Sequence, residues 1–167
     1  MKNALLFAAA CLLSGCVTYG ERGLVPGIST QADVLLKMGE PALRWENPDH
    51  SLQLAYRRGH IGVDAYMVYL DATGRLSRIE NVMTMPAFAR IQTGMNQDDV
   101  LRTLGPPDPA ETVYYAARRE LDWGWRYCDD WNATAHFYVL FDHDSGGVRS
   151  TMSVREHCGD GDCRCSH

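Results

Sequence analysis

The feature that most constrains the fold is a short segment that occurs twice in the chain. Residues 29–41 read STQADVLLKMGEP and residues 95–107 read MNQDDVLRTLGPP. Both contain the pattern Q-x-D-V-L-x-x-x-G-x-P, and the two copies are 66 positions apart. Self-similarity at a fixed spacing is typical of chains built from similar structural units. The sequence therefore predicts two tandem units of related fold.

Each copy of the pattern has the signals of one short capped helix. Thr30 and Asn96 suit the N-cap position, because their side-chain oxygens can accept hydrogen bonds from the free N–H groups of a first turn. Asp33 and Asp99 follow three residues later and place a carboxylate at the positive helix end. The glycine of the pattern fits a left-handed C-cap, and the proline after it prevents continuation. We expect a helix in each copy.

Three segments with strand-like patterns follow each predicted helix. They are residues 51–57, 65–70 and 75–81 in the first unit, and residues 120–127, 135–141 and 148–155 in the second. Residues 86–92 form an extra leading segment, in which Pro86 suits the first position of a helix. We therefore expect an α+β fold with units at 27–85 and 86–156. Each unit has a short helix or helices followed by a three-stranded antiparallel meander.

The N-terminus has the pattern of a processed lipoprotein. Lys2 precedes ten apolar residues, which is the length of a signal-peptide core and too short to cross a bilayer. This run ends in LLSGC, which resembles the lipobox of bacterial lipoproteins and implies cleavage before Cys16 and acylation of its sulfur, as with palmitate. Acyl chains then attach the protein to a membrane. The alternative is a buried N-terminal helix. We expect a signal peptide at 1–15 and a lipidated tether at 16–26, with Val17 favouring the outer membrane.

These motifs together resemble those of the BamE-like (SmpA/OmlA) lipoprotein family. The resemblance rests on the lipobox, on G-M-x-x-x-x-V-L-x-x-L-G-x-P at Gly94–Pro107, and on Asp142 and Gly147 before the last strand. It implies α-α-β-β-β units and a role as an accessory lipoprotein of the machinery that assembles outer-membrane β-barrels. A secreted β-lactamase inhibitor protein is similar as a tandem of this fold that binds its target through a concave sheet surface. The assembly factor has a single such domain, whereas two are predicted here.

Composition excludes several other classes of function. The 167 residues carry a formal charge of −5, which does not favour binding to nucleic acid. No glycine-rich phosphate loop and no catalytic constellation is present in the sequence. We expect a protein without catalysis, cofactor or resident metal.

Alternating aromatic residues mark a possible binding surface. Leu121, Trp123, Trp125 and Tyr127 share one face of a predicted strand, because side chains alternate along a strand with period two. The other face of the sheet is also apolar, as at Tyr138. One interpretation of this stripe is core packing against the helices. Because both faces are apolar, either the two units pack together, or one aromatic face is open to a partner. The candidate partner-binding residues are Tyr69, Trp123, Trp125 and Tyr138.

The chain ends in a cysteine-rich tail at 157–167. Residues 156–167 read EHCGDGDCRCSH. Cys158, Cys163 and Cys165 join Cys128 as disulfide candidates, which suits the oxidising periplasm. A bridge within C-x-C would be strained, so one tail cysteine is expected to pair with Cys128. The alternatives are a soft-metal site, although the spacing matches no standard zinc motif, and a free reactive tail.

The expected function is protein binding on the periplasmic face of the outer membrane. The family resemblance implies support of β-barrel protein assembly or of envelope integrity. The first alternative is an inhibitor or regulatory binder of a periplasmic enzyme that uses the aromatic sheet face. The second is a metal-handling lipoprotein that uses the cysteine-rich tail.

Overall fold

The computed structural model describes residues 23–57, 62–159 and 161–165. The predicted signal peptide at 1–15 and the predicted lipidation site at Cys16 lie outside the described residues, as does most of the predicted tether at 16–26.

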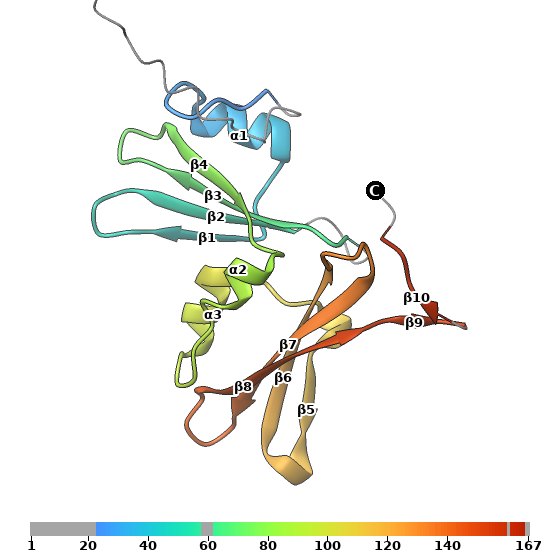
Figure 1. Cartoon of the computed structure of the whole chain (residues 1–167). Coiled ribbons are helices and arrows are strands. Elements are labelled where there is room, and N and C mark those ends of the chain that lie inside the picture. The colour runs from blue at the N-terminus through green and yellow to red at the C-terminus, as the bar shows by residue number, and fades with distance from the viewer. Residues whose placement is uncertain (1–22, 58–61, 160, 166–167) are drawn as a thin grey trace, which may run out of the picture.

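The described chain is α+β, with short helices and two four-stranded antiparallel sheets (Figure 1). The first half contains α1 (Gln31–Met38), β1 (Leu43–Glu46), β2 (Leu52–Arg57), β3 (Ala65–Leu70) and β4 (Leu76–Asn81). The second half contains α2 (Met85–Phe88), α3 (Gln97–Leu104), η2 (Pro109–Glu111), β5 (Val113–Tyr115), η3 (Ala116–Arg118), β6 (Glu120–Cys128), β7 (Thr134–Asp142) and β8 (Val148–Arg155). A small hairpin of β9 (His157–Cys158) and β10 (Gly161–Asp162) follows. The strand orders are β1-β2-β3-β4 and β5-β6-β7-β8.

The two predicted helices and their N-caps are confirmed. In α1 the Thr30 side chain accepts from the Asp33 N–H, and the Asp33 carboxylate accepts from the Thr30 N–H. Asn96 and Asp99 form the same reciprocal pair at α3. Both helices end at a glycine with positive φ, 79° at position 39 and 77° at position 105, but the ψ angles of −162° and −171° differ from those of the expected left-handed C-cap. The helix predicted at 86–92 is the shorter α2, which begins one residue earlier than expected.

The expected three-stranded meander is wrong in one respect, because each sheet has a fourth strand. The six predicted strands are present as β2–β4 and β6–β8, but β1 and β5 pair with β2 and β6 at one edge. These edge strands are four and three residues long. A segment this short contains too few alternations to reveal a strand by pattern, and it is extended because its neighbour supplies the hydrogen bonds.

The molecule is built in layers. Figure 1 shows α1 on one side of the β1–β4 sheet, α2 and α3 on its other side, and the β5–β8 sheet beyond them. One core lies between α1 and the first sheet and contains Val34, Leu54 and Val68. The second and larger core joins the first sheet, the α2–α3 layer and the second sheet. Helices therefore cover both faces of the first sheet.

Helix α3 is held by both sheets. The Gln53 side-chain nitrogen of β2 donates to the carbonyl of Arg102, with 2.5 Å between N and O. The Trp125 indole N–H of β6 donates to the Gly105 carbonyl at 3.3 Å. A Cβ at Gly105 would lie 3.5 Å from the Cβ of Ala55, so the helix end packs closely on the first sheet. The two halves of the chain thus share one continuous interior.

Candidate docking surface on the second sheet

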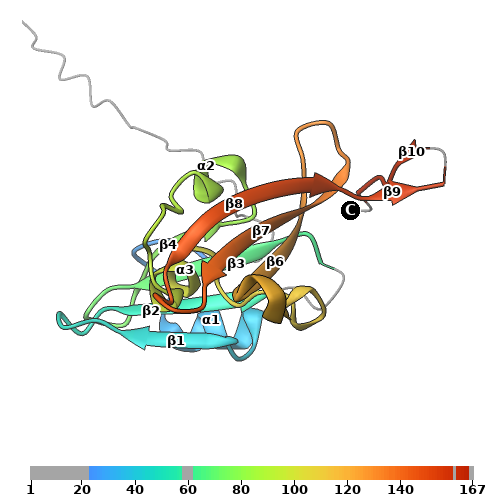
Figure 2. The same cartoon turned by 90° about the horizontal axis from the view of Figure 1, so that it is seen from below.

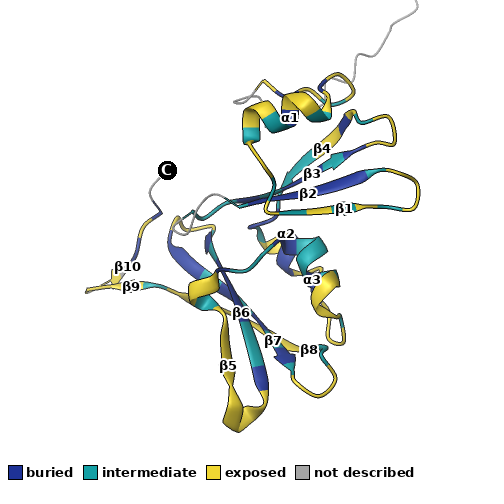
Figure 3. Ribbon diagram, turned by 180° about the vertical axis from the view of Figure 1, so that it is seen from behind, coloured by how far each residue is buried: buried dark blue, intermediate teal, exposed yellow. Residues whose placement is uncertain are grey.

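The β5–β8 sheet has one covered and one uncovered face. Trp125, Phe137 and Val139 point toward the helices and are buried. Antiparallel pairing sets Gly124 opposite Tyr138 and Tyr138 opposite Met152, so these three lie on the other face. In the view from below, β7 and β8 lie in front of the helix layer (Figure 2), and the burial colouring shows β5 as exposed (Figure 3). We define the outer face as Val113, Tyr115, Asp122, Gly124, Tyr138, Leu140, Met152 and Val154.

A hollow of about 430 Å³ lies on this outer face. Its lining combines the apolar and aromatic side chains of Val113, Tyr115, Tyr138, Leu140 and Met152 with the charged side chains of Glu111, Arg118, Glu120 and Asp122. Met152 is 48% exposed, while Tyr138 and Leu140 are only partly exposed. The apolar floor and charged walls of this hollow are typical of a binding site that fixes the orientation of its ligand.

Gly124 makes room for this arrangement. A Cβ at this position would lie 2.6 Å from the Cβ of Glu111 and 2.8 Å from Cε1 of Tyr138. The Tyr138 ring therefore lies across the glycine, and its hydroxyl donates to the Glu111 carboxylate at 2.7 Å. Burial, followed by the bond to Glu111, raises the pKa of the Tyr138 hydroxyl, so this group remains a donor at neutral pH.

One end of the outer face is closed by a polar network. The Arg126 guanidinium donates twice to the Glu156 carboxylate, at 2.7 and 2.8 Å. A ring nitrogen of His136 lies 2.6 Å from the same carboxylate, and the His136 ring stacks on Tyr138. The Arg126 bond is the main reason why the pKa of Glu156 falls to about 2. The Glu156 carboxylate is therefore paired with two side chains, whereas the buried Nδ1 of His136 has no hydrogen-bond partner among the described residues.

Asp122 differs from the other carboxylates around the hollow. Its Oδ1 is buried and has no hydrogen-bond partner in the described part of the chain. Neighbouring Glu120 is paired with Arg118 at 3.0 Å and with Arg149 at 3.1 Å. Burial, and then repulsion from Glu120, raises the pKa of Asp122. The hollow thus contains a partly desolvated carboxylate without a hydrogen bond at one oxygen, a costly condition for an isolated protein.

The four residues proposed from the sequence do not form one surface. Trp123 and Trp125 are buried, at 9% and 1% exposure, so the expectation that they meet a partner is corrected. They pack against the helices, and Trp123 also contacts Phe141 edge-on. Tyr69 lies in the first sheet beneath the Arg78 guanidinium, 3.6 Å from the ring centroid, and packs at the border of the larger core. Tyr138 alone belongs to the outer face.

Most of the outer face was not predicted from the sequence. Asp122 alternates with the tryptophans along β6, so period two already placed it on the opposite side of the strand. Glu111, Val113 and Tyr115 lie in η2 and the short β5, two elements that the sequence pattern does not predict. Their position depends on pairing between β5 and β6, with Val113 opposite Asp122.

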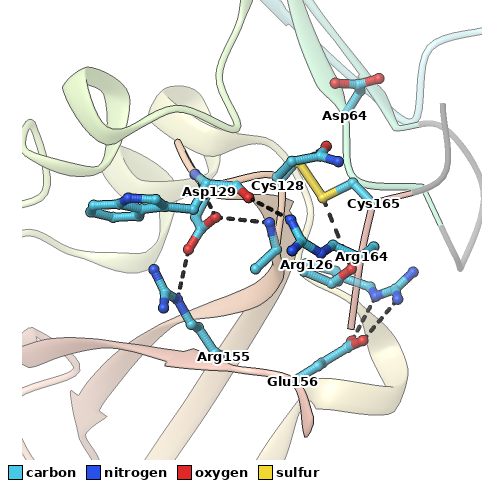
Figure 4. The surroundings of a disulfide bond; sticks show 12 residues. Asp64, Arg126, Cys128, Asp129, Arg155, Glu156, Arg164 and Cys165 are labelled. Carbon is cyan, nitrogen blue, oxygen red and sulfur yellow. Dashed lines mark hydrogen bonds and ion pairs between the residues drawn. A yellow bond between two sulfur atoms is a disulfide. The ribbon is translucent and has the colours of Figure 1, made fainter. Parts of the chain in front are cut away.

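The cysteine-rich tail contains two disulfides. Cys128 is bonded to Cys165, and Cys158 to Cys163, which agrees with the expected bridge between the tail and Cys128. Figure 4 shows the first bridge beside the Asp129–Arg155 ion pair. The Thr134 N–H also donates to the Cys163 carbonyl at 2.7 Å, so the tail is bound to the second sheet. All four sulfurs are in disulfides and are not available as thiolate ligands for the metal-handling alternative.

Two further properties concern the residues that the structure describes. None of their helices has the length and apolar character needed to span a membrane. Within residues 23–57, 62–159 and 161–165, no group of three or more His, Cys, Asp or Glu side chains is arranged to hold a metal ion.

Comparisons with protein-family models, with curated proteins and with solved structures found no match to this chain.

Proposed function

We propose that this chain is a non-catalytic lipoprotein, anchored by Cys16 to the periplasmic face of the outer membrane, that binds protein partners. In this proposal it consists of two tandem BamE-like units, and its work is to support outer-membrane β-barrel assembly or envelope integrity. The lipobox and the repeated helix pattern support the anchor and the family. The partner-binding role rests on one observation, the uncovered outer face of the second sheet with its hollow.

The layered packing supports a docking role for this face. The first sheet has both faces covered, and its second face is occupied by α2 and α3. The second sheet has only one covered face, and Val113, Tyr115 and Met152 remain 40 to 48% exposed on the other. A contiguous apolar area with a polar border is a common feature of protein-interaction sites.

In-cell photo-crosslinking tests this proposal. A benzophenone amino acid is placed at Met152 on the outer face, and in a matched control at Leu36, which is 82% exposed on α1 at the other end of the layers. We expect ultraviolet light to link the Met152 variant, but not the Leu36 variant, to a component of the barrel-assembly machinery, as identified by mass spectrometry.

The other outcomes are equally informative. A single different periplasmic enzyme linked at Met152 would replace the assembly role by the inhibitor or regulatory alternative. Absence of any protein adduct at Met152, in cells where the lipoprotein is correctly localised, would contradict a docking function for this face. Signal processing is checked separately, since Cys16→Ser should leave the protein without its acyl chains.

A further inference from the structure

We infer that the hollow on the outer face receives a basic side chain, lysine or arginine, from an otherwise apolar segment of a protein partner, with Asp122 as its counter-charge. This inference rests on the proposed protein-binding function and adds the chemistry of the partner. It depends on three observations: the charges around the hollow, the buried Asp122 oxygen, and the hydrogen bond that Gln53 makes at the matching position of the first sheet.

The charge of the hollow selects a cation. Three carboxylates and one guanidinium line it. The Glu120 carboxylate is already paired with Arg118 and Arg149. The Glu111 carboxylate accepts the Tyr138 hydroxyl, whereas Asp122 retains a buried oxygen without a hydrogen bond. An incoming ammonium or guanidinium group would neutralise this carboxylate and so offset the cost of its partial desolvation.

The apolar residues of the hollow suit the same ligand, and its wall already holds one basic side chain. The Arg118 guanidinium already lies 4.2 Å from the centroid of the Tyr115 ring, which is a cation–π contact. Leu140 and Met152 offer apolar surface for the aliphatic part of a long side chain. A basic residue with apolar neighbours therefore matches both the charge and the floor of this hollow.

Gln53 of the first sheet occupies the position that corresponds to Asp122, but on a face that the helix layer covers. The two central strands have the same order of residue types: a polar residue, a large apolar residue, a small residue, an aromatic residue and an arginine. In β2 this order is Gln53-Leu54-Ala55-Tyr56-Arg57, and in β6 it is Asp122-Trp123-Gly124-Trp125-Arg126. Gln53 donates to the Arg102 carbonyl of the helix layer. Asp122 occupies the matching position on the uncovered sheet. A carboxylate can only accept, so its partner must be a donor.

Small probes of matched shape test the inference directly. n-Butylguanidinium and the neutral n-butylurea are titrated into the lipid-free mature domain, and the methyl signals of Val113, Leu140 and Met152 are followed by NMR. We expect saturable shifts with n-butylguanidinium and at least tenfold weaker binding of n-butylurea. Asp122→Asn should weaken binding of n-butylguanidinium at least tenfold.

A matched variant controls for net charge. Asp49→Asn removes the same charge from the β1–β2 turn, where Asp49 accepts from Ser51, and should bind n-butylguanidinium like the wild type. Equal binding of the two probes, or unchanged binding in Asp122→Asn, would overturn the inference. Loss of folding is excluded by recording the thermal unfolding of each variant.

The inference and the proposed function can fail separately. If a partner is crosslinked at Met152 but Asp122→Asn changes neither the adduct nor the binding of n-butylguanidinium, the docking function stands and the basic-residue inference fails. If n-butylguanidinium binds through Asp122 but no protein is crosslinked at Met152, the site exists and the proposed protein-binding function fails.

Discussion

At the scale of single residues, two carboxylates of the second sheet have opposite relations to the fold. Glu156 is fully engaged by Arg126 and His136, whereas Asp122 is partly desolvated and lacks a bond at Oδ1. The pKa of the first is lowered and that of the second is raised. Glu156 therefore stabilises the folded state in its charged form, and Asp122 destabilises it.

The first prediction is that Asp122→Asn increases stability at neutral pH. The folded pKa of Asp122 lies above its unfolded value, so its ionisation opposes folding at pH 7, and this opposition disappears below the unfolded pKa. We expect the free energy of unfolding at pH 7 to rise by roughly 1 kcal/mol, because the amide carries no charge to be desolvated or repelled by Glu120. Urea unfolding at pH 7 and pH 3 measures the difference.

Asp49→Asn is the control for this prediction. The side chain and backbone N–H of Ser51 lower the pKa of Asp49, so its ionised form favours folding and its replacement should give no increase in stability. A loss of stability in Asp122→Asn at pH 7 would show that the ionised carboxylate has a partner in the fold. Stability gained by removing a binding residue is a common sign of a site kept for function.

The second prediction concerns the pH dependence from Glu156. Its pKa falls from 4.5 to about 2 on folding, so its contribution is complete above about 4.5 and is lost as the pH falls toward 2. Glu156→Gln should lower the free energy of unfolding at pH 7 by about 1–3 kcal/mol, the range for a hydrogen bond to a charged group.

The pH series distinguishes this effect from general destabilisation. The difference between Glu156→Gln and wild type should shrink steadily between pH 4.5 and 2. Glu40→Gln, at an exposed position after α1, serves as the control and should change stability little at any pH. A deficit in Glu156→Gln that is constant down to pH 2 would contradict a role for the charged carboxylate.

At the scale of elements, the outer face depends on one small residue in β6. Gly124 faces Glu111 of η2 and Tyr138 of β7, and no side chain larger than hydrogen fits between them. The cross-strand Tyr138 ring covers this glycine, a known way of supporting a glycine within a sheet. The shape of the hollow and the position of η2 are therefore linked through β6.

The third prediction is that Gly124→Ala displaces Glu111 and Tyr138. The added methyl group would lie under 3.0 Å from atoms of both side chains, and we expect a loss of about 1–3 kcal/mol in stability from overpacking. The Tyr138–Glu111 hydrogen bond should also break. The measurement combines thermal unfolding with the ultraviolet titration of the tyrosines.

Gly161→Ala is the matched control, because a Cβ there meets no atom within 4 Å and the backbone has no positive φ. It should have little effect on stability. If Gly124→Ala were as stable as Gly161→Ala and left the tyrosine titration unchanged, Tyr138 and η2 would not be packed over Gly124 as described.

At the scale of the whole molecule, the layers and the tail make one unit from both halves of the chain. The α2–α3 layer is shared by the two sheets, and Arg57 of the first sheet forms a largely buried ion pair with Asp108, beyond α3. The disulfide between Cys128 and Cys165 ties the C-terminal segment to the end of β6. Folding therefore couples segments that are far apart in the sequence.

The fourth prediction is that the two disulfides contribute unequally to stability. Cys128–Cys165 spans 37 residues and Cys158–Cys163 spans five. The chain-entropy relation gives about 4 kcal/mol for the long loop and about 2 kcal/mol for the short one. Replacing each pair by serines and measuring guanidinium unfolding tests this order. A larger loss from the short bridge would show that the tail is held by other contacts.

The sequence determined the local structure of this protein. The capping pairs Thr30–Asp33 and Asn96–Asp99 use groups within one turn, so the N-terminal ends of the helices were predicted correctly from spacing alone. The longer strands were also predicted, because their patterns extend over six or more residues. The bridge from the tail to Cys128 followed from the few pairings that the cysteine spacing allows.

Only the tertiary structure decided which surface is open. Period two shows that Trp123 and Trp125 share a face opposite Asp122, but it does not say which face the helices cover. That choice depends on how the chain passes from the first sheet through α2 and α3 to the second. The edge strand β5 and its residues Val113 and Tyr115 depend on pairing with β6. Burial and edge pairing arise between distant segments, so no local pattern contains them.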